Sequence, residues 1–223
     1  MQVFVTGATG VMGRSVVSAL LEAGHDVSGL ARTDDGARTL TERGVEAVVG
    51  GLFDPPGLVA AFAGCDVVCN LATHMPVGFA AMRPGAWRVN DRIRAHGSRL
   101  VAQAARSAGV RRLVQESVSM IYADGGEEWL TEDSPVVVNR ATEPMAMAEA
   151  HAQEFASGSR ESVVLRFAGI IGDDDYTRWR LARARAGRLD ACGQRRGRRD
   201  GGSRGAHLAG RCLQRRCRAG TPA

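Results

Sequence analysis

The chain contains no lysine, and all 29 of its basic residues are arginines. It also lacks any run of the ~20 apolar residues that a membrane-spanning helix needs, and its first residues, MQVFVTGATG, lack the charged and apolar regions of a signal peptide. The five cysteines are odd in number and show no C-x₂-C pair, which excludes a disulfide framework and a zinc-knuckle spacing. Cys65 and Cys69 lie in one apolar run and are interpreted as buried thiols. We therefore expect a cytoplasmic protein with no membrane segment and no metal site.

Hydrophobic residues are largely missing from the C-terminal part of the chain. Residues 188–223 contain no Val, Ile, Phe, Met, Trp or Tyr, but they hold ten Arg and two Asp, a net charge of +8. Because the whole chain carries +5, residues 1–187 carry −3, and the basic balance comes from this segment alone. A nucleic-acid-binding arm would be expected to place aromatic residues between its arginines for base stacking, and the cysteines and His207 lack metal-ligand spacing.

Two interpretations remain for residues 188–223. Low hydrophobicity combined with high net charge is typical of a disordered tail. The abrupt change to Arg, Gly, Ala and Cys is also what GC-rich DNA yields when it is read out of frame, and the absence of lysine independently suggests GC-rich coding. We favour a frameshifted or aberrant end. The sequence is thus divided into a folded domain, residues 1–187, and a basic tail, and nucleic acid is not expected among the partners.

The rest of the chain alternates between two hydrophobic patterns. Short β-branched runs predict strands at residues 2–6, 26–31, 45–49, 66–72, 112–117 and 162–171. Between them, helical spacing predicts helices at residues 11–23, 35–43, 56–63, 91–108 and 141–157. Alternating strands and helices indicate parallel pairing with right-handed crossovers, and nearly continuous apolar strands indicate a sheet that is covered on both faces. The predicted fold class is α/β, a doubly wound parallel sheet.

A glycine-rich turn joins the first predicted strand to the first predicted helix. Gly7, Gly10 and Gly13 follow a G-x-x-G-x-x-G spacing within VFVTGATGVMG. In such a turn the first glycine permits the sharp bend, the second lets backbone approach a pyrophosphate, and the third lets the helix pack closely on the strand. The helix start then offers free N–H groups to the anion. This position predicts a dinucleotide site that also includes the neighbouring residues Thr9, Val11 and Met12.

The end of the second predicted strand bears on the choice of dinucleotide. In NAD-binding sites an acidic residue ~20 positions after the glycines bonds the ribose 2′-hydroxyl. Here Ala31 and Arg32 occupy the strand end. The planar guanidinium of Arg32 suits a 2′-phosphate, although a solvated surface arginine is the alternative. The sequence therefore favours NADP over NAD.

These features together resemble a known family. TGATGVMG, GCDVVCNLAT (residues 64–73), Asn90, RRLVQES (111–117) and TEDSP (131–135) are similar to the NAD(P)-dependent epimerase/dehydratase group, the extended or atypical short-chain dehydrogenases/reductases. The resemblance covers about residues 1–187. It implies a Rossmann-like domain, hydride chemistry on a sugar nucleotide or another small carbonyl or alcohol, and a nicotinamide half of the cleft lined by Leu71, Ala72 and Thr73. By the same resemblance, we expect most of the family's substrate-binding region to be missing from this sequence.

The chain departs from the family at the catalytic pair. Active members carry Tyr and Lys at Y-x-x-x-K, four residues apart on one helix face, where the lysine lowers the pKa of the phenol. The matching stretch, EPMAMAEAHAQEF, has Met145 and Glu149 at those positions, and a carboxylate would raise the pKa of a nearby phenol. No shift of the alignment restores the pair, because the chain has no lysine.

Other side chains are candidates for the chemistry. The family's catalytic Ser/Thr position falls on Val118, which Ser117 and Ser119 flank. Ser117 is a candidate near the cofactor, with an ordinary strand-end serine as the alternative. Tyr122 is a candidate acid, with a packing aromatic as the alternative. Glu116 and His151 are further candidates. Glu116 is alternatively expected to pair with Arg111 or Arg112, and His151 to be a solvated helix residue.

Three functions follow as hypotheses. The first is an NAD(P)-binding protein with hydride chemistry on a small-molecule substrate, and the second is a non-catalytic NAD(P)-binding module that senses or regulates by cofactor occupancy. A nucleic-acid binder is a third hypothesis, since the tail is basic. A homodimer is a further expectation, because a truncated sheet would expose an apolar edge.

Overall fold

The computed structural model describes residues 1–76, 78–169, 178 and 181–182. They form a six-stranded sheet in the order β3-β2-β1-β4-β5-β6, and every pairing is parallel. The strands are β1 (Gln2–Thr6), β2 (Asp26–Ala31), β3 (Glu46–Val49), β4 (Val67–Asn70), β5 (Arg112–Val118) and β6 (Glu161–Phe167). This order confirms the predicted doubly wound α/β fold. The proposed tail at 188–223 lies outside the described residues.

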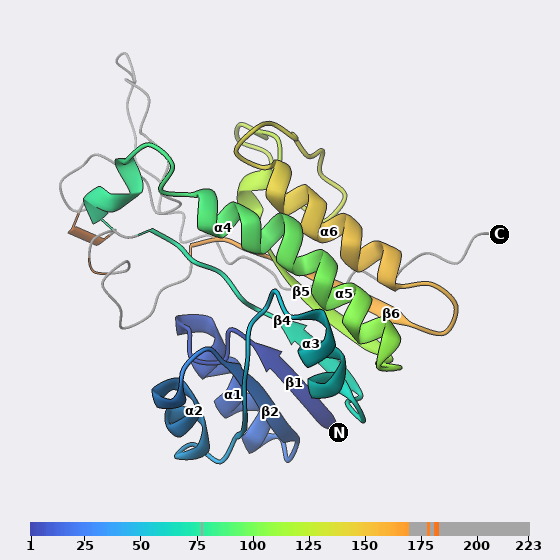
Figure 1. The fold of residues 1–223 in the computed structure, drawn as a ribbon. Coiled ribbons are helices and arrows are strands. Elements are labelled where there is room, and N and C mark those ends of the chain that lie inside the picture. The colour runs from blue at the N-terminus through green and yellow to red at the C-terminus, as the bar shows by residue number, and fades with distance from the viewer. Residues whose placement is uncertain (77, 170–177, 179–180, 183–223) are drawn as a thin grey trace.

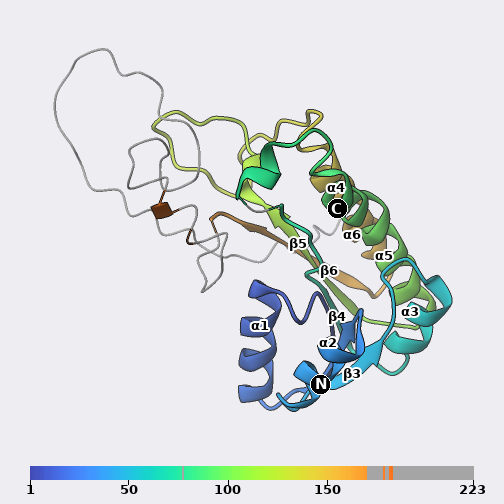
Figure 2. The ribbon, with the colours of Figure 1, turned by 60° about the vertical axis from the view of Figure 1, so that its left-hand side comes forward.

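Helices connect the strands and cover both faces of the sheet. They are α1 (Val11–Glu22), α2 (Asp34–Thr41), α3 (Pro55–Phe62), α4 (Arg88–Arg92), α5 (Ser98–Ser107) and α6 (Glu143–Phe155). A π-helical turn, η2 (Ile93–Gly97), joins α4 to α5. In Figures 1 and 2, α1 lies on one side of the sheet, and α3, α5 and α6 lie on the other. The short 3-10 helices η1 (Gly78–Met82) and η3 (Ser119–Ile121) follow β4 and β5.

The two core clusters explain why the strands are apolar on both faces. In β1, Phe4 packs with Leu58 and Phe62 of α3, and with residues of α5 and α6. Its neighbours Val3 and Val5 point the other way, into a cluster with residues of α1 and α2. Successive side chains of a strand alternate between faces, so a strand with helices on both sides must be apolar throughout.

Local capping sets where two helices begin. Thr33 caps α2, since its hydroxyl accepts a hydrogen bond from the N–H of Gly36 at 3.2 Å. Asp54 caps α3 in the same way, accepting from the N–H of Gly57 at 3.3 Å, and Pro55 occupies the first turn, where its missing N–H costs nothing. The helix predicted at residues 56–63 thus begins one residue earlier, at Pro55, and ends at Phe62.

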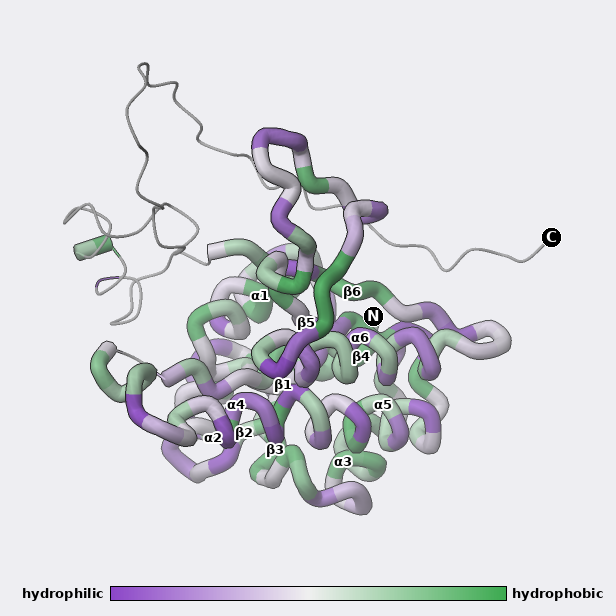
Figure 3. The backbone as a smooth tube through the Cα atoms, turned by 90° about the horizontal axis from the view of Figure 1, so that it is seen from above, coloured by the Kyte–Doolittle hydropathy of each residue, from purple (hydrophilic) through white to green (hydrophobic). Residues whose placement is uncertain are grey.

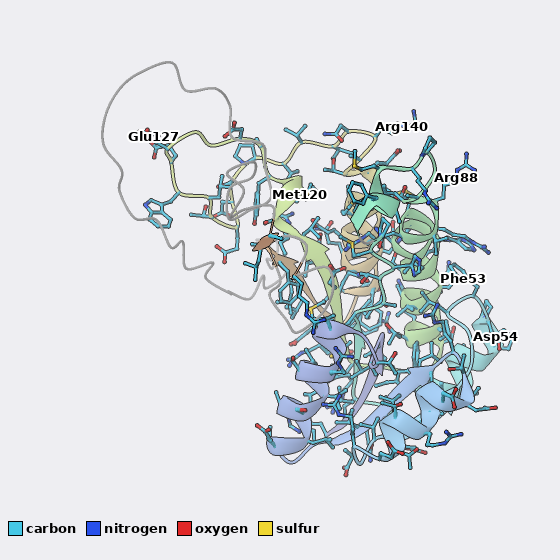
Figure 4. The ribbon with its side chains drawn as sticks, turned by 90° about the vertical axis from the view of Figure 1, so that its left-hand side faces the viewer. Phe53, Asp54, Arg88, Met120, Glu127 and Arg140 are labelled. Carbon is cyan, nitrogen blue, oxygen red and sulfur yellow. The ribbon has the colours of Figure 1, made fainter. Side chains whose placement is uncertain are left out.

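The segments that follow β4 and β5 are the longest connections among the described residues. Residues 71–87 lead from β4 to α4, and residues 119–142 lead from β5 to α6. Figure 3 shows hydrophilic and hydrophobic residues mixed along the second connection, which stands clear of the sheet. In Figure 4, Met120 marks its start beside the end of β5, and Glu127 lies at its far end. Both connections leave from the carboxyl edge of the sheet, where ligands bind in open α/β folds.

Candidate functional site

The glycine turn places free backbone donors at the carboxyl end of β1. Gly7 adopts φ 69°, and its carbonyl accepts a hydrogen bond from the N–H of Gly10 at 2.9 Å. Helix α1 begins directly after Gly10, which has an extended backbone and, as a glycine, no side chain that could cap the helix. The first turn holds no acidic residue. The N–H groups at the helix start, from Val11 to Gly13, are therefore available to an anion. Thr9 and Gly10 are exposed beside them.

Close packing explains why two of these glycines admit no side chain. A Cβ atom at Gly13 would lie 2.1 Å from the carbonyl oxygen of Gly7, and one at Gly7 would lie 2.7 Å from the carbonyl oxygen of Leu71. The turn therefore touches the residues that follow β4, the predicted nicotinamide segment, where Leu71 is buried and Ala72 and Thr73 are half-buried. The sheet order reverses between β1 and β4, and this switch point is where doubly wound sheets bind nucleotides.

A ladder of buried polar side chains ties the strand ends together. The hydroxyl of Thr6 donates to the Asn70 Oδ1 at 2.6 Å, and the Asn70 amide donates to the Gln115 Oε1 at 2.8 Å. The Gln115 amide in turn donates to the carbonyl oxygen of Glu116 at 2.8 Å. The ladder links β1, β4 and β5 beneath the candidate cofactor edge. Sequence reasoning gave these residues no role, although an asparagine that ends an apolar strand is a visible signal.

Arg32 stands at the same edge, immediately after β2. It is exposed, and in the described part of the chain it forms no ion pair. The next residue, Thr33, caps α2, so the backbone around Arg32 is fixed while its side chain stays free. Arg32 thus lies directly after β2, the position from which the sequence predicts a contact to the cofactor ribose.

The positions of the family's catalytic pair hold a different arrangement on α6. Met145 is buried, and Glu149 is buried with both carboxylate oxygens in use. The hydroxyl of the fully buried Ser117 donates to Glu149 Oε1 at 2.6 Å. Arg166 donates to the same carboxylate twice, from Nε at 2.9 Å and from Nη2 at 2.6 Å. Three donors on one carboxylate make Glu149 an anchor for groups on β5 and β6.

Tyr122 lies against this cluster. The Arg166 guanidinium carbon is 4.7 Å from the centre of the half-buried Tyr122 ring. Glu149 raises the pKa of Arg166 above its ordinary value, chiefly by accepting its hydrogen bonds, and Tyr122 adds to the rise. Ser119, which flanks Val118 on the side away from Ser117, belongs to the 3-10 turn η3, because β5 ends at Val118.

A second buried ion pair lies where the π-helical turn meets β5. Arg94 donates from Nη2 to Glu116 Oε1 at 2.7 Å, and the side chains are 2% and 4% exposed. Within the described residues, Nε and Nη1 of Arg94 and the amide nitrogen of Asn90 have no hydrogen-bond partner. Burial raises the pKa of Glu116 above its ordinary value, and the charge of Arg94 opposes the rise. The expected pairing of Glu116 with Arg111 or Arg112 is therefore wrong.

The arginines expected to pair with Glu116 bond elsewhere. Arg111 pairs with Asp66, and Arg112 pairs with Glu161, both at the amino end of the sheet. His151 is half-buried rather than solvated, and its Nδ1 lies 2.9 Å from the hydroxyl of Ser98. That hydroxyl donates to the carbonyl oxygen of Arg94, so Nδ1 of His151 is the donor to Ser98. Burial lowers the pKa of His151 below its ordinary value.

Apolar side chains lie in the two connections that leave the carboxyl edge of the sheet, after β4 and after β5. The segment after β4 borders a wide-open hollow of about 590 Å³, lined by His74, Met75, Pro76, Ala80, Arg83, Pro84, Gly85 and Ala86. The N–H of His74 donates to Asn90 Oδ1 at 3.1 Å, which ties this segment to α4. Phe79 and Met82 in this segment, and Trp129 in the connection after β5, are exposed. Exposed large apolar residues near a cleft are typical of a binding surface.

Among the described residues, no helix is both long and apolar enough to cross a membrane. The same part of the chain contains no group of three or more His, Cys, Asp or Glu side chains that could hold a metal ion.

Comparison with known proteins gives consistent matches. A family model described as NAD(P)H-binding matches residues 7–189. A 3-diazoavenalumate denitrifying reductase from a Streptomyces species is 32% identical over 180 residues, 77% of this chain and 57% of that protein. A UDP-glucose 4-epimerase from Streptomyces lividans is 28% identical over 157 residues, 69% of this chain and 46% of that protein.

A solved structure matches over a similar range. A short-chain dehydrogenase/reductase superfamily protein from Agrobacterium tumefaciens with bound NAD has a TM-score of 0.59 and 32% sequence identity. The match covers 75% of this chain and 49% of that chain. The chain thus spans about half the length of the relatives that it matches.

Proposed function

Because the chain belongs to the NAD(P)H-binding family, we propose that it binds NADP(H) in preference to NAD(H) and transfers hydride to or from a small carbonyl or alcohol. The resemblance to epimerases, dehydratases and short-chain reductases is confirmed by the relatives described above. The observation that carries the proposal is the cradle after β1, where backbone at Gly7 and Gly13 packs too closely for any side chain beneath an uncapped helix start. A pyrophosphate needs such a cradle.

Each part of the cofactor has a matching part of the edge. The glycine turn, with the backbone at Thr9, Val11 and Met12, would hold the pyrophosphate. Leu71, Ala72 and Thr73 would line the nicotinamide half, since the turn contacts this segment directly. Arg32 would pair with a ribose 2′-phosphate through charge-assisted hydrogen bonds. When bound, the cofactor supplies or accepts a hydride, and the side chains of the site must then give or take a proton.

The two hydroxyls expected to take part differ in how free they are. Ser117 is fully buried and donates its proton to Glu149, so it supports its neighbours rather than a substrate. Tyr122 is half-buried at the mouth of the connection after β5 and is the better placed proton donor. The exposed apolar residues at this edge favour a substrate with an apolar portion. A homodimer stays a prediction.

A second candidate function is a non-catalytic NAD(P)-binding module. Met145 and Glu149 in place of the family's catalytic pair favour it, since Met145 has no ionisable proton and the carboxylate of Glu149 is already occupied by Ser117 and Arg166. The two candidates share the cofactor cradle and differ only in chemistry.

Two measurements test the proposal and separate the candidates. Calorimetric titration of the full chain with NADPH and with NADH measures binding and preference. Incubation with 4-deuterated NADPH and a panel of aliphatic and aromatic aldehydes and ketones then shows whether deuterium reaches the products. Binding with deuterium transfer supports an oxidoreductase, and binding without transfer supports the non-catalytic module. If neither nucleotide binds, both are wrong.

Replacing Arg32 with alanine is expected to remove the preference for NADP(H). Charged hydrogen bonds contribute about 1.5–3 kcal/mol, so the affinity for NADPH should fall roughly 10- to 100-fold while that for NADH stays unchanged. Calorimetric titration of both nucleotides measures the effect. Arg38→Ala, which removes another exposed arginine on α2, is the matched control and should leave both affinities as they are. Equal losses for both nucleotides in Arg32→Ala would contradict the 2′-phosphate contact.

A further inference from the structure

Arg166 contacts Tyr122, the residue that would donate the proton in the proposed function, on which this inference rests. We propose that Arg166 is a positioning residue, which orients the phenol of Tyr122 toward the substrate oxygen and stabilises the phenolate left after the proton is given. Glu149 and Ser117 hold Arg166 in place. The proton donor then comes from the end of β5, and helix α6 supplies only the anchor.

The register of the sheet brings the members of this cluster together. Ser117 on β5 is the direct partner of Arg166 on β6, so their side chains lie on the same face of the sheet. Helix α6 packs on that face and brings Glu149 between them. The nearest charged partner of Arg166 is thus 17 residues away in sequence, and Ser117 is 32 residues from Glu149.

The anchor fixes the guanidinium in both position and plane. Arg166 uses Nε and Nη2 on the two oxygens of Glu149, the bidentate geometry that a planar guanidinium and a carboxylate prefer. The side chains are 21% and 7% exposed, so water competes little for these bonds. Oε1 of Glu149 also accepts a hydrogen bond from the hydroxyl of Ser117, which prevents the carboxylate from turning away.

The fixed guanidinium meets the ring of Tyr122. A cation 4.7 Å from the ring centre is attracted by the π electrons, and the attraction strengthens when the ring becomes a phenolate. The main chain of Tyr122 is held as well, because the residue forms a bridge with Val136 and its N–H donates to the carbonyl oxygen of Ser119. The bridge fixes where the side chain starts, and Arg166 then fixes how the ring lies.

Tyr122 and Arg166 lie at the cofactor edge of the sheet. All six strands are parallel, so the ends of β5 and β6 face the same way as the glycine turn after β1 and the segment after β4. β5 is the direct neighbour of β4. A substrate next to the nicotinamide segment would therefore approach the start of the connection that carries Tyr122, beside Met120 in Figure 4.

The proton step balances with the groups present and the proposed cofactor. A bound reduced cofactor would supply the hydride for the new C–H bond, and the carbonyl π electrons would then move to the substrate oxygen. The O–H bond of Tyr122 breaks, its proton joins that oxygen, and its electron pair stays on the phenol oxygen beside Arg166. Water then returns a proton to the phenolate. The reverse sequence oxidises an alcohol.

A spectroscopic experiment tests the orientation without any substrate. The chain contains two tyrosines, Tyr122 and Tyr176, so tyrosine labelled with ¹³C at Cζ alone gives, in a Tyr176→Phe background, one signal that reports on Tyr122. In Arg166→Met and Glu149→Gln the signal should shift and broaden, and Arg166→Lys should restore part of the original position. Arg112→Met breaks a pair between the same two strands at their other end and should leave the signal unchanged. An unchanged signal in a folded Arg166→Met chain would overturn the proposal.

Kinetics test the role of the oriented phenol. General acid catalysis contributes about 10²- to 10⁴-fold, so Tyr122→Phe should lower the rate of deuteride transfer by about that factor. Arg166→Met should lower kcat by about 10²-fold with little change in the KM for NADPH, and Arg166→Lys should recover part of the loss. Full activity of Tyr122→Phe overturns the proton role. Nucleotide binding with no transfer by the unmodified chain instead contradicts the proposed oxidoreductase, and the tyrosine signal then still decides the orientation.

Discussion

Replacing Gly13 with alanine is expected to abolish nucleotide binding and to lower the free energy of unfolding by about 3 kcal/mol or more. The new Cβ would lie 2.1 Å from the Gly7 carbonyl oxygen and 2.8 Å from the Ala8 Cα, and both are backbone atoms that cannot rotate away. Helix α1 must then move off β1, which destroys the cradle as well as the packing. Urea denaturation measures the stability, and titration with NADPH measures the binding.

Gly36→Ala is the matched control for this prediction. Gly36 also lies in the first turn of a helix, but its nearest neighbour to an added Cβ is the Thr33 hydroxyl at 3.4 Å. Alanine is the better helix former, so this variant should be as stable as the unmodified chain or slightly more stable. A Gly13→Ala chain that keeps both its stability and its affinity for NADPH would contradict the assignment of the turn.

Replacing Arg94 with methionine is expected to lower the free energy of unfolding by about 3–5 kcal/mol near neutral pH, because it leaves the carboxylate of Glu116 buried without its partner. The side chain of Glu116 is 4% exposed, so water cannot take over the role of the guanidinium. Denaturation in urea at neutral pH checks the loss. The exposed pair of Arg112 and Glu161 gives the control, since Arg112→Met should cost at most about 1 kcal/mol.

The loss in Arg94→Met should shrink as the pH falls. Burial already raises the pKa of Glu116, and removing Arg94 removes the charge that opposes the rise. A carboxyl whose pKa is higher in the folded state favours folding below its unfolded pKa and loses that contribution as the pH rises through the folded pKa. The stability deficit is therefore largest at neutral pH and smaller in acid. A deficit that grows on acidification would show that Glu116 is not the source.

Replacing both members of the Arg94–Glu116 pair should recover much of the stability. In Arg94→Met/Glu116→Leu no unpaired charge remains, and a hydrophobic pair often matches a buried ion pair. The orphan donors Nε and Nη1 of Arg94 disappear as well, which removes a further cost. Denaturation of the double variant beside both single variants, Arg94→Met and Glu116→Leu, gives the energy of interaction between the two residues.

The features that could be predicted from the sequence are those that depend on the hydrophobicity pattern and turn residues of a short segment. The strand at 26–31 and the start of α1 after Gly10 follow from apolar runs and turn chemistry, and the structure has them as expected. The ends of the later strands were less accurate. The strand predicted at 66–72 ends at Asn70, and the one predicted at 162–171 ends at Phe167, because an apolar run does not reveal where pairing with the neighbouring strand stops.

The polar contacts of the site could not be read in the same way. Glu116 was paired in prediction with the arginines four and five residues before it, but Arg94, on a helix 22 residues away, is the actual partner. The contact depends on a π-helical turn that no local pattern announces, although such turns often mark functional positions. Likewise Glu149 was identified as the residue that replaces a lysine, but its bonds to Ser117 and Arg166 needed the register of β5 against β6.

The ladder formed by Thr6, Asn70 and Gln115 should keep the strand ends rigid both before and after a nucleotide binds. Because these side chains already bridge three neighbouring strands, the strand ends lose little conformational entropy when a ligand binds. Amide hydrogens there should exchange slowly with deuterated solvent before NADPH is added and change little afterwards. New protection should instead appear in residues 71–76 and in the connection after β5, where a bound nucleotide would shield the backbone from solvent.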